Sequence, residues 1–197
     1  MERKRIEKQI DFILEVDKEK NIIRQTHLSE NGRRENDAEH AWHIAIMVYL
    51  LKEYANEEFD VAKAMMMALI HDIVEIDAGD TYAYDSKGLE TQKMREEQAA
   101  ERIFGLLPGD QGEELKNLFK EFEKSETPEA RFVRAMDNFQ PLLLNNSNDG
   151  RDWREHEIGR NQIMKRHIKT KLGSNIIWEC AMKIIEENVR NGNIKDD

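Results

Sequence analysis

A histidine and an aspartate stand side by side, as His71-Asp72, within an otherwise apolar run that extends from Ala68 to Val74. Burying an ionisable side chain without a partner is costly, so this pair needs partners inside the fold. A divalent cation satisfies an imidazole and a carboxylate together, because both donate lone pairs to it. The pair therefore predicts a metal site, provided that other segments of the chain supply further ligands.

Two other segments bring residues of the same chemical kind to apolar helix faces. The spacing after Asp37, a good N-cap residue, predicts a helix over residues 38–54 with His40 on its buried face. Thr127-Pro128 opens another predicted helix, and Asp137 lies on its apolar side. Each group taken alone is also explained as a satisfied core histidine or a buried hydrogen-bonding acid. Together, two imidazoles and two carboxylates form a mixed nitrogen and oxygen set that suits Mn, Fe, Co, Ni or Zn.

The elements that must position these residues are helices. The chain has three prolines and few alternating strand patterns, and apolar residues recur at helical spacing along its length. We therefore predict a single all-α domain over residues 1–191, with residues 192–197 as a frayed tail. The first helix carries Ile6, Ile10, Ile13 and Leu14, and later helices are expected over residues 38–54, 60–77, 89–107, 113–124, 128–144, 153–172 and 174–191.

The segments between these helices are predicted to be irregular. Residues 17–26 read as a polar connection, and residues 30–36 as a loop in which Asn31-Gly32 favours a turn. Gly79 is expected to end the helix that carries His71-Asp72. Pro141 is expected to kink the helix that carries Asp137, because proline has no N–H to donate to the carbonyl four residues back.

Composition narrows the class of function. The 197 residues carry a formal net charge of -10, which argues against nonspecific binding of polynucleotides or anionic membranes. No apolar run approaches the roughly 20 residues that a membrane helix needs, and the charged N-terminal residues 1–11 do not fit a signal peptide. The single cysteine, Cys180, has no internal disulfide partner, which favours the cytoplasm. We expect Cys180 to fill space among the isoleucines of the last helix.

The order His40, His71-Asp72 and Asp137 resembles that of the HD-domain superfamily of metal-dependent phosphohydrolases. Residues 36–40, Asn-Asp-Ala-Glu-His, are similar to the acidic helix start with its histidine in that family. Residues 71–80, His-Asp-Ile-Val-Glu-Ile-Asp-Ala-Gly-Asp, resemble the His-Asp-x-x-Glu-x-x-x-Gly-Asp block of the YfbR-like 5'-deoxynucleotidases, and residues 93–97 are also similar. The resemblance covers residues 6–144, most of the chain.

The resemblance implies an HD-type helical bundle in which His40, His71, Asp72 and Asp137 hold one metal ion. It also implies that Glu75 positions or deprotonates a water molecule, and that Asp80 assists near the sugar or the attacking water. The alternatives are that Glu75 is a solvated acid at a helix end and Asp80 a loop cap. Glu75 follows His71 by one helical turn, so both side chains project from the same face.

Arg24 fits the family position of an arginine that contacts the substrate phosphate, and a guanidinium binds two phosphate oxygens at once. Arg33 and Arg34, in the adjoining loop, are rival phosphate contacts or surface charges. The family often has a tryptophan directly after that arginine, whereas this chain has Gln25-Thr26. The expected stacking contact with the base or sugar is therefore missing.

The positions of the other histidines bear on the number of metal ions. No histidine lies between Asp72 and Asp137, where two-metal members of the superfamily use extra histidines, so the resemblance implies a single ion, with Mg as a further possibility. His43 follows His40 by nearly one helical turn, and we interpret it as packing beside Trp42 rather than as a ligand. His156 and His167 are interpreted as surface or structural residues.

These observations predict a phosphohydrolase that removes the 5'-phosphate of a small nucleotide, a deoxyribonucleoside 5'-monophosphate, by attack of a metal-bound water. One alternative keeps the site and changes the ester to a triphosphate or an alarmone-like nucleotide. Another is a catalytically silent nucleotide-sensing module that acts through a partner. The resemblance also implies a homodimer, and the net charge of -10 predicts that neither polynucleotides nor membranes are partners.

Overall fold

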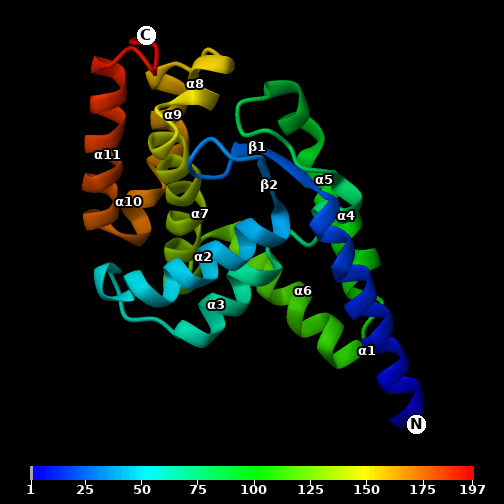
Figure 1. The fold of residues 1–197 in the computed structure, drawn as a ribbon. Coiled ribbons are helices and arrows are strands. Elements are labelled where there is room, and N and C mark those ends of the chain that lie inside the picture. Colours follow the sequence, from blue (N-terminus) through cyan, green and yellow to red (C-terminus); the bar gives the residue numbers. More distant parts are fainter. Residues whose placement is uncertain (1) are drawn as a thin grey trace.

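The computed structural model describes residues 2–197, and within them the side chains of all residues except 2, 3 and 86. Met1, where the charged N-terminal segment begins, lies outside this range. The prediction of a helical fold is confirmed, with one small sheet added (Figure 1). The elements are α1 (Glu2–Val16), the 3-10 helix η1 (Asp17–Asn21), β1 (Ile23–His27), β2 (Arg34–Asn36), α2 (Asp37–Leu51), the 3-10 helix η2 (Lys52–Tyr54), α3 (Val61–Ile70), α4 (Glu75–Ala78), α5 (Ser86–Phe104), α6 (Gly109–Lys124), α7 (Pro128–Ser147), α8 (Arg151–Glu155), α9 (Arg160–His167), α10 (Thr170–Gly173) and α11 (Asn175–Arg190).

Helix α7 is the centre of the fold, and most other elements pack on it (Figure 1). Thr127 caps its first turn and Pro128 occupies its first position, as the sequence predicts. Most of its apolar residues are buried, which is what a helix surrounded by others requires. Helix α10 approaches α7 closely because Gly173 has no Cβ; an added Cβ would lie 2.3 Å from the carbonyl oxygen of Arg131. The helix continues through Pro141 to Ser147, past the predicted end at residue 144.

The predicted helix over residues 60–77 is in fact two helices with a turn between them. Helix α3 ends at Ile70, and α4 begins at Glu75. The His71 ring binds the carbonyl of Ala68 through Nδ1 at 2.8 Å, which competes with the helical hydrogen bond that this carbonyl would otherwise accept. The next hydrogen bonds span three residues, as from Glu75 N to Asp72 O at 2.8 Å. Gly79 ends α4 with a φ of 74°, as expected.

A two-stranded antiparallel hairpin replaces the predicted connection and loop before α2. Strand β1 pairs with β2, with Ile23 opposite Asn36 and His27 opposite Arg34. Glu30 and Asn31 adopt positive φ angles of 60° and 56° in the turn. Polar residues such as those of β2 have weak strand preference, so the packing of β1 on α7 and of β2 on α2 accounts for the hairpin better than propensity does.

In the C-terminal third, the first of the two predicted helices is replaced by three short ones, α8, α9 and α10. The tail is ordered against the body rather than frayed: Ile194 is 1% exposed, and Lys195 pairs with Gly159. Cys180 is exposed, which corrects the expectation that it fills space in the core. The buried positions of α11 are Ile177, Ala181, Ile185 and Asn188, and Cys180 does not fall on their stripe.

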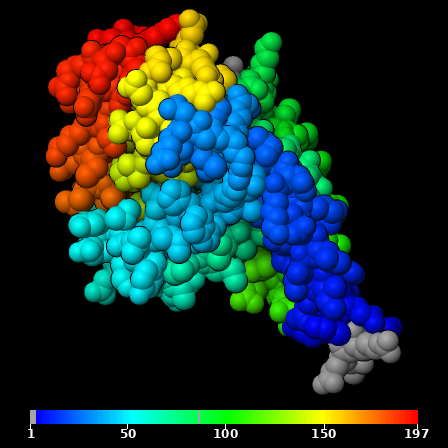
Figure 2. All heavy atoms as spheres, viewed as in Figure 1, coloured from blue at the N-terminus to red at the C-terminus, as the bar shows by residue number. Residues whose placement is uncertain are grey.

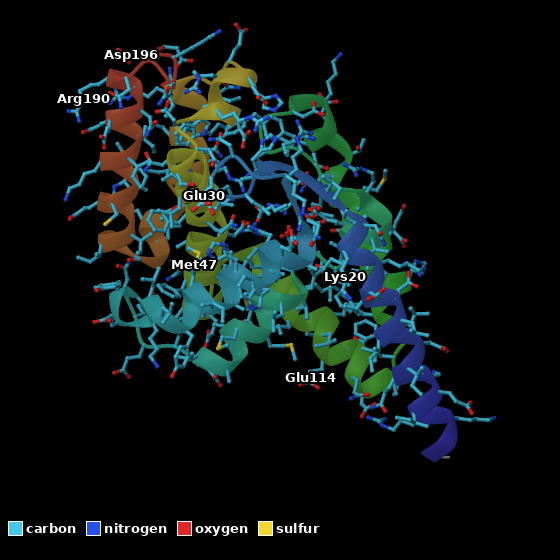
Figure 3. All side chains as sticks on the ribbon, in the orientation of Figure 1. Lys20, Glu30, Met47, Glu114, Arg190 and Asp196 are labelled. Atoms are coloured by element: carbon cyan, nitrogen blue, oxygen red, sulfur yellow. The ribbon has the colours of Figure 1, made fainter. Side chains whose placement is uncertain are left out.

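The surface has apolar areas on α1 and α2. The predicted apolar face of α1 is exposed, and it consists of Ile6, Ile10, Ile13 and Leu14. Figure 2 shows this helix projecting from the body. In Figure 3 the labelled Glu114 and Asp196 lie at the periphery, whereas Met47 lies among the helices. Within residues 2–197, no helix is both long and apolar enough to cross a membrane.

Candidate metal centre

The four predicted metal ligands come together where α2, the α3–α4 turn and α7 meet. His40 Nε2 lies 3.2 Å from Asp137 Oδ1 and 3.9 Å from Asp72 Oδ2. His71 Nε2 lies 3.0 Å from Asp72 Oδ1 and 3.8 Å from Asp137 Oδ1. The ligand atoms of His40, His71 and Asp72 all lie within 4.8 Å of one another. All four residues are at most 9% exposed, so water does not compensate their charges.

The hydrogen bonds of both histidines direct a ring nitrogen at the carboxylates. His71 Nδ1 donates to the carbonyl of Ala68, which only accepts, so Nε2 of the neutral ring carries a lone pair. His40 Nδ1 lies 3.1 Å from Gln140 Oε1, which fixes the same tautomer. Two lone pairs then face two carboxylates, and His71 Nε2 is buried without a hydrogen bond. This arrangement requires a shared proton or a cation, so the donor set fits a divalent metal ion.

The electrostatics of the cluster agree with that requirement. Burial lowers the pKa of His71, but Asp72 and Asp137 outweigh it and raise this pKa to about 10. Burial, together with the charge of Arg24, lowers the pKa of His40 to about 4. Burial raises the pKa of Asp137, but His40 and His71 hold it well below its ordinary value. Without a cation the cluster therefore keeps one proton on His71, and a metal ion competes with that proton.

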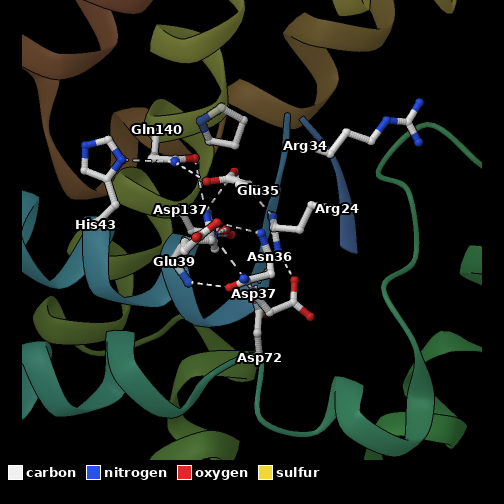
Figure 4. A network of polar contacts seen from close by, with 12 residues as sticks. Arg24, Arg34, Glu35, Asn36, Asp37, Glu39, His43, Asp72, Asp137 and Gln140 are labelled. Atoms are coloured by element: carbon white, nitrogen blue, oxygen red, sulfur yellow. Dashed lines mark hydrogen bonds and ion pairs between the residues drawn. The ribbon is translucent and has the colours of Figure 1, made fainter. Parts of the chain in front are cut away.

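Arg24 is held by three acidic side chains. Its Nη1 donates to Asp72 Oδ2 at 2.9 Å and to Asp37 Oδ1 at 3.1 Å, and its Nε lies 3.7 Å from Glu35 Oε1 (Figure 4). Burial opposes the charge of the guanidinium, but Asp72 and Asp37 raise the pKa of Arg24 well above its ordinary value. Arg24 therefore orients a predicted metal ligand, a role that the sequence did not indicate.

Three residues of this network were missed by the sequence reasoning. Asp37, predicted as an N-cap, is a buried partner of Arg24, while Asn36 caps α2 and forms a capping box with Glu39. Glu35, on β2, accepts a hydrogen bond from Gln140 Nε2 at 2.9 Å. Burial raises the pKa of both Asp37 and Glu35 to about 7. The third missed residue is Gln140. A polar residue on the buried stripe of α7 needs a hydrogen-bond partner, so Gln140 was the signal in the sequence that pointed to this network.

A cavity of about 140 Å³ adjoins the cluster, and Asp72 and Asp137 line it. Glu75 and Asp80, the predicted catalytic acids, line it as well. Burial and the neighbouring Asp72 and Asp37 raise the pKa of Glu75 well above its ordinary value. Burial raises the pKa of Asp80 too. Glu75, at the start of α4, and Asp80, just after its end, thus share the cavity wall with two of the predicted metal ligands.

The predicted substrate contacts are placed differently from one another. Arg24, with Gln25 and Thr26 after it, lines the cavity. In the positions that the structure gives them, Arg33 and Arg34 are not part of its lining. Arg33 pairs with the half-buried Glu39 at the surface, and Figure 4 shows Arg34 pointing away from the network. The cavity has two other arginines, Arg134 and Arg166, which sequence reasoning had not singled out.

The remaining histidines have varied surroundings. His43 Nδ1 lies 3.1 Å from Gln140 Nε2, and its ring packs against Trp42, as interpreted from the sequence. His156 packs on Tyr82. His167 is 2% exposed and lines the cavity, so of the two interpretations, surface or structural, its burial excludes the surface one. Burial lowers the pKa of His167 to about 3, so the ring is neutral.

A second histidine and acid cluster links the hairpin to α8. His27 Nδ1 lies 2.6 Å from Asp152 Oδ1, and the backbone N–H of His27 donates to Asp152 Oδ2 at 3.1 Å. The two hydrogen bonds use both carboxylate oxygens, so this contact ties β1 to α8 without requiring a metal.

Comparisons with known proteins agree with this arrangement. A family model described as HD domain matches residues 16–178. The 5'-deoxynucleotidase HDDC2 of Homo sapiens is 30% identical over 154 residues, which are 78% of this chain and 72% of the human protein. The 5'-deoxynucleotidase HDDC2 of Bos taurus is 29% identical over 135 residues, 68% of this chain and 64% of the bovine protein.

A solved structure extends the likeness to the whole fold. The crystal structure of a protein titled "Predicted metal-dependent phosphohydrolase" from Magnetospirillum magnetotacticum MS-1 superposes with a TM-score of 0.94 at 44% identity, over 98% of this chain and 97% of that one. A conserved hypothetical protein from Pyrococcus furiosus, at 23% identity and a TM-score of 0.58 over 92% of this chain and 99% of that one, shares the fold. Because the family model spans most of the chain and the buried histidines and aspartates converge as the motif predicts, this protein is a member of the HD domain family.

Proposed function

We propose that this protein is a metal-dependent phosphohydrolase that removes the 5'-phosphate of a deoxyribonucleoside 5'-monophosphate. The observation that carries the proposal is the buried cluster of His40, His71, Asp72 and Asp137, opening through its carboxylates onto a cavity. The relatives named 5'-deoxynucleotidases support the substrate class.

The proposed cofactor is one divalent ion, either Mn, Co, Fe, Ni or Zn, or else Mg, held by these four residues. Histidine and carboxylate ligands in this ratio do not select strongly among first-row metals. When bound, the ion lowers the pKa of a coordinated water and neutralises charge on a phosphate oxygen. The tautomers fixed by Ala68 and Gln140 prepare both imidazoles for this role before the ion arrives.

The acids on the cavity wall supply the proton transfers in this proposal. Glu75, which lines the cavity beside Asp72, orients a water molecule and accepts its proton. Asp80, which follows the end of α4, contacts the sugar or the same water. Arg24 holds Asp72 in place and offsets the negative charge of the acids around it.

A phosphate-release assay with a nucleotide panel tests the proposal. The purified protein, loaded in parallel with Mn, Co, Ni, Zn or Mg, is given deoxyribonucleoside and ribonucleoside monophosphates and deoxyribonucleoside triphosphates. We expect inorganic phosphate from the deoxyribonucleoside monophosphates, and a loss of at least a hundredfold in Asp72→Ala. Asp110→Ala, at an exposed ion pair with Arg5, is the matched control and should retain full activity.

Other outcomes assign other functions. Release of pyrophosphate or triphosphate would assign the site to a different phosphoester. Tight nucleotide binding without turnover by any metal form would assign it to a nucleotide-sensing module, the second candidate. That candidate is favoured by Gln25 and Thr26, which line the cavity where the family often has a tryptophan.

We propose in addition that the protein is a homodimer that works in the cytoplasm and binds neither polynucleotides nor membranes. Exposed apolar residues support the dimer, on α1 (Ile6, Ile10, Ile13 and Leu14) and on α2 (Trp42, Ile46, Tyr49 and Leu50). The single cysteine supports the reducing compartment, and the net charge of -10 supports the absence of polyanionic partners. Light scattering should give a mass twice that of the 23.2 kDa chain.

A further inference from the structure

The loop between α4 and α5 forms one side of the cavity beside the metal centre. Every residue from Asp80 to Tyr84 lines that cavity, as do the predicted metal ligands Asp72 and Asp137. The rest of the wall comes mainly from β1, α7, α8 and α9. The loop differs from these elements because it brings two large aromatic side chains, Tyr82 and Tyr84, to a cavity that is otherwise mostly polar.

The two tyrosine rings are open to the cavity, whereas the other rings of its lining are covered. Trp153 is 3% exposed and His167 is 2% exposed. Tyr82 and Tyr84 are only half-buried, and they pack against the edge of the core while they line the cavity. Ring surface that stays in contact with water forgoes the stabilisation that burial gives. A flat apolar part of a ligand would cover this surface.

Contacts among neighbouring rings fix the orientation of the pair. The ring centres of Tyr82 and Tyr84 lie 5.3 Å apart, with the planes at 78°, which is an edge-to-face contact. Tyr82 also lies 4.8 Å from the ring centre of His156, the residue that ends α8. Rings that are already held in place lose little conformational entropy when a planar group stacks on them.

Arg95, on α5, anchors both ends of the loop. Its Nη2 donates to Thr81 Oγ1 at 2.7 Å and to the carbonyl of Gly88 at 3.3 Å, and its Nη1 donates to the carbonyl of Ala78. Ala78 precedes the two tyrosines and Gly88 follows them, so a single side chain closes the loop at its base. These contacts give a structural role to residues 93–97, which the sequence singled out without assigning one.

The distance along the loop fits a ligand of nucleotide size. A chain advances at most about 3.6 Å per residue, so the backbone of Tyr82 lies within about 7 Å of that of Asp80, and the backbone of Tyr84 within about 14 Å. A small ligand whose phosphoester lies at the metal ligands can therefore contact Asp80 and the two rings together.

We propose that Tyr82 and Tyr84 form the surface on which the nucleobase of the substrate stacks, and that Arg95 is the positioning residue of this surface. The inference rests on the proposed function for its substrate and on the contacts above for its geometry. Stacking on aromatic side chains tolerates every base, because each base has a flat π-face. The surface therefore selects nucleotides over sugar phosphates that lack a base, and discriminates weakly among the four bases.

The test compares Tyr82→Leu and Tyr84→Leu with Tyr54→Leu, at an exposed tyrosine outside the cavity lining. Phosphate release by the Mn-loaded proteins is measured with deoxyadenosine 5'-monophosphate and with 2-deoxyribose 5-phosphate, which has the same phosphoester but no base. In the two cavity variants we expect the KM for the nucleotide to rise about 5- to 100-fold, while the KM for the sugar phosphate stays unchanged. Tyr54→Leu should match the wild type with both substrates.

Conservative variants separate stacking from a purely structural role. Tyr82→Phe and Tyr84→Phe keep the rings and should keep a KM near that of the wild type. A leucine variant that fails to fold would lose activity toward both substrates, and the phenylalanine variants then decide by comparing the two substrates. An equal rise in KM for both substrates, or phenylalanine variants as impaired as the leucine variants, would overturn the inference.

Arg95→Met tests the anchor. The variant loses the hydrogen bonds at both ends of the loop, so we expect faster amide hydrogen exchange in residues 79–88 and a higher KM for the nucleotide. Because the same loop carries Asp80, kcat should fall as well. Arg95→Lys keeps one donor group and should lie between Arg95→Met and the wild type. Exchange rates and a KM equal to those of the wild type in Arg95→Met would refute the role given to Arg95.

A binding measurement separates this inference from the proposed function. Isothermal titration gives the affinity of each protein for deoxyadenosine, which has the base and no phosphate. If the wild type hydrolyses nucleotides and the leucine variants do so with an unchanged KM, the inference fails and the function stands. If no nucleotide is hydrolysed but deoxyadenosine binds and the leucine variants lose that binding, the function fails and the inference stands.

Discussion

At the scale of single residues, the site is a set of buried charges that need a cation. His40 and His71 turn their Nε2 atoms toward Asp72 and Asp137, and each ring is held in that orientation by a hydrogen bond from its Nδ1 atom. Buried ionic groups rarely add stability by themselves, since desolvation offsets their attraction. The cluster is therefore best understood as a binding site that lowers the stability of the empty protein.

The hydrogen bond between Gln140 and His40 predicts the effect of one substitution. Gln140→Leu removes the acceptor for His40 Nδ1 and the donor for Glu35, both inside a buried network. Partners of this kind typically contribute 10- to 100-fold to metal affinity, so we expect a loss of about that size. Competition with a coloured chelator measures it. Gln98→Leu, on the exposed side of α5, is the control, and equal affinities in the two variants would contradict the prediction.

The burial of Glu19 predicts how stability changes with pH. Burial, with the charge of Asp72, raises the pKa of Glu19 to about 8, against about 4.3 in an unfolded chain. Between these values the folded protein keeps a proton that the unfolded chain releases, so stability falls as pH rises. We expect Glu19→Gln to be more stable than the wild type by about 1–3 kcal/mol at pH 8, and equal to it near pH 4.5.

Urea unfolding of the metal-free protein at pH 5, 6.5 and 8 measures this difference. A stability gain that grows toward low pH would have the wrong sign and would refute the assignment of a raised pKa to Glu19.

At the scale of elements, short irregular segments aim the functional side chains. The turn between α3 and α4 carries Asp72, and Glu75 follows at the start of α4, so that both line one cavity wall. The hairpin brings Arg24 and Glu35 over the start of α2, and the capping box of Asn36 and Glu39 fixes that start. His40 lies in the first turn after the cap, so the cap determines where its ring points.

The capping box predicts a cost for Asn36→Ala. The variant loses the hydrogen bond from Glu39 N to Asn36 Oδ1, 2.9 Å long, and leaves that N–H without its partner. We expect a loss of about 1 kcal/mol in the free energy of unfolding. Asn36→Asp keeps an acceptor and should stay near the wild type. Urea denaturation at constant metal concentration measures both variants, and equal losses in them would show that the cap is not the cause.

At the scale of the whole molecule, the site joins parts of the chain that are distant in sequence. Arg24 comes from the hairpin, Asp137 from the central helix and Arg166 from α9, and all three line one cavity. The hairpin is held to α8 by His27 and Asp152, and Asp152 also lines the cavity. Metal binding at such a junction stabilises the fold as a unit.

Removal of the metal ion should therefore lower the melting temperature. A ligand at a hundred times its Kd adds about 2.7 kcal/mol of stability, which corresponds to roughly 5–10 °C for a chain of this size. Calorimetry of the metal-loaded protein, of the protein treated with a chelator, and of the chelated protein after metal is restored measures the shift. Asp72→Ala should show no shift. An identical melting temperature with and without metal in the wild type would contradict the prediction.

The local pattern of the sequence was sufficient for the fold class and for which histidines and aspartates cluster in the core. Helical periodicity is a short-range property, so His40 and Asp137 were assigned to buried faces without knowledge of their neighbours. Thr127-Pro128 and Gly79 likewise affect only the helical turn next to them. The start of α7 at Pro128 and the end of α4 before Gly79 were therefore predicted correctly. The apolar run around His71-Asp72 indicated the metal site for the same reason.

Tertiary structure decided what depends on contacts between distant segments. The hairpin, the break after Ile70 and the packed tail at Ile194 follow from packing and from side-chain hydrogen bonds that override local preference. The partners of Arg24 belong to the same class. Whether an arginine is neutralised or available depends on which acids the fold brings within a few ångströms of it, and interactions across more than a hundred residues leave no periodic trace in the sequence.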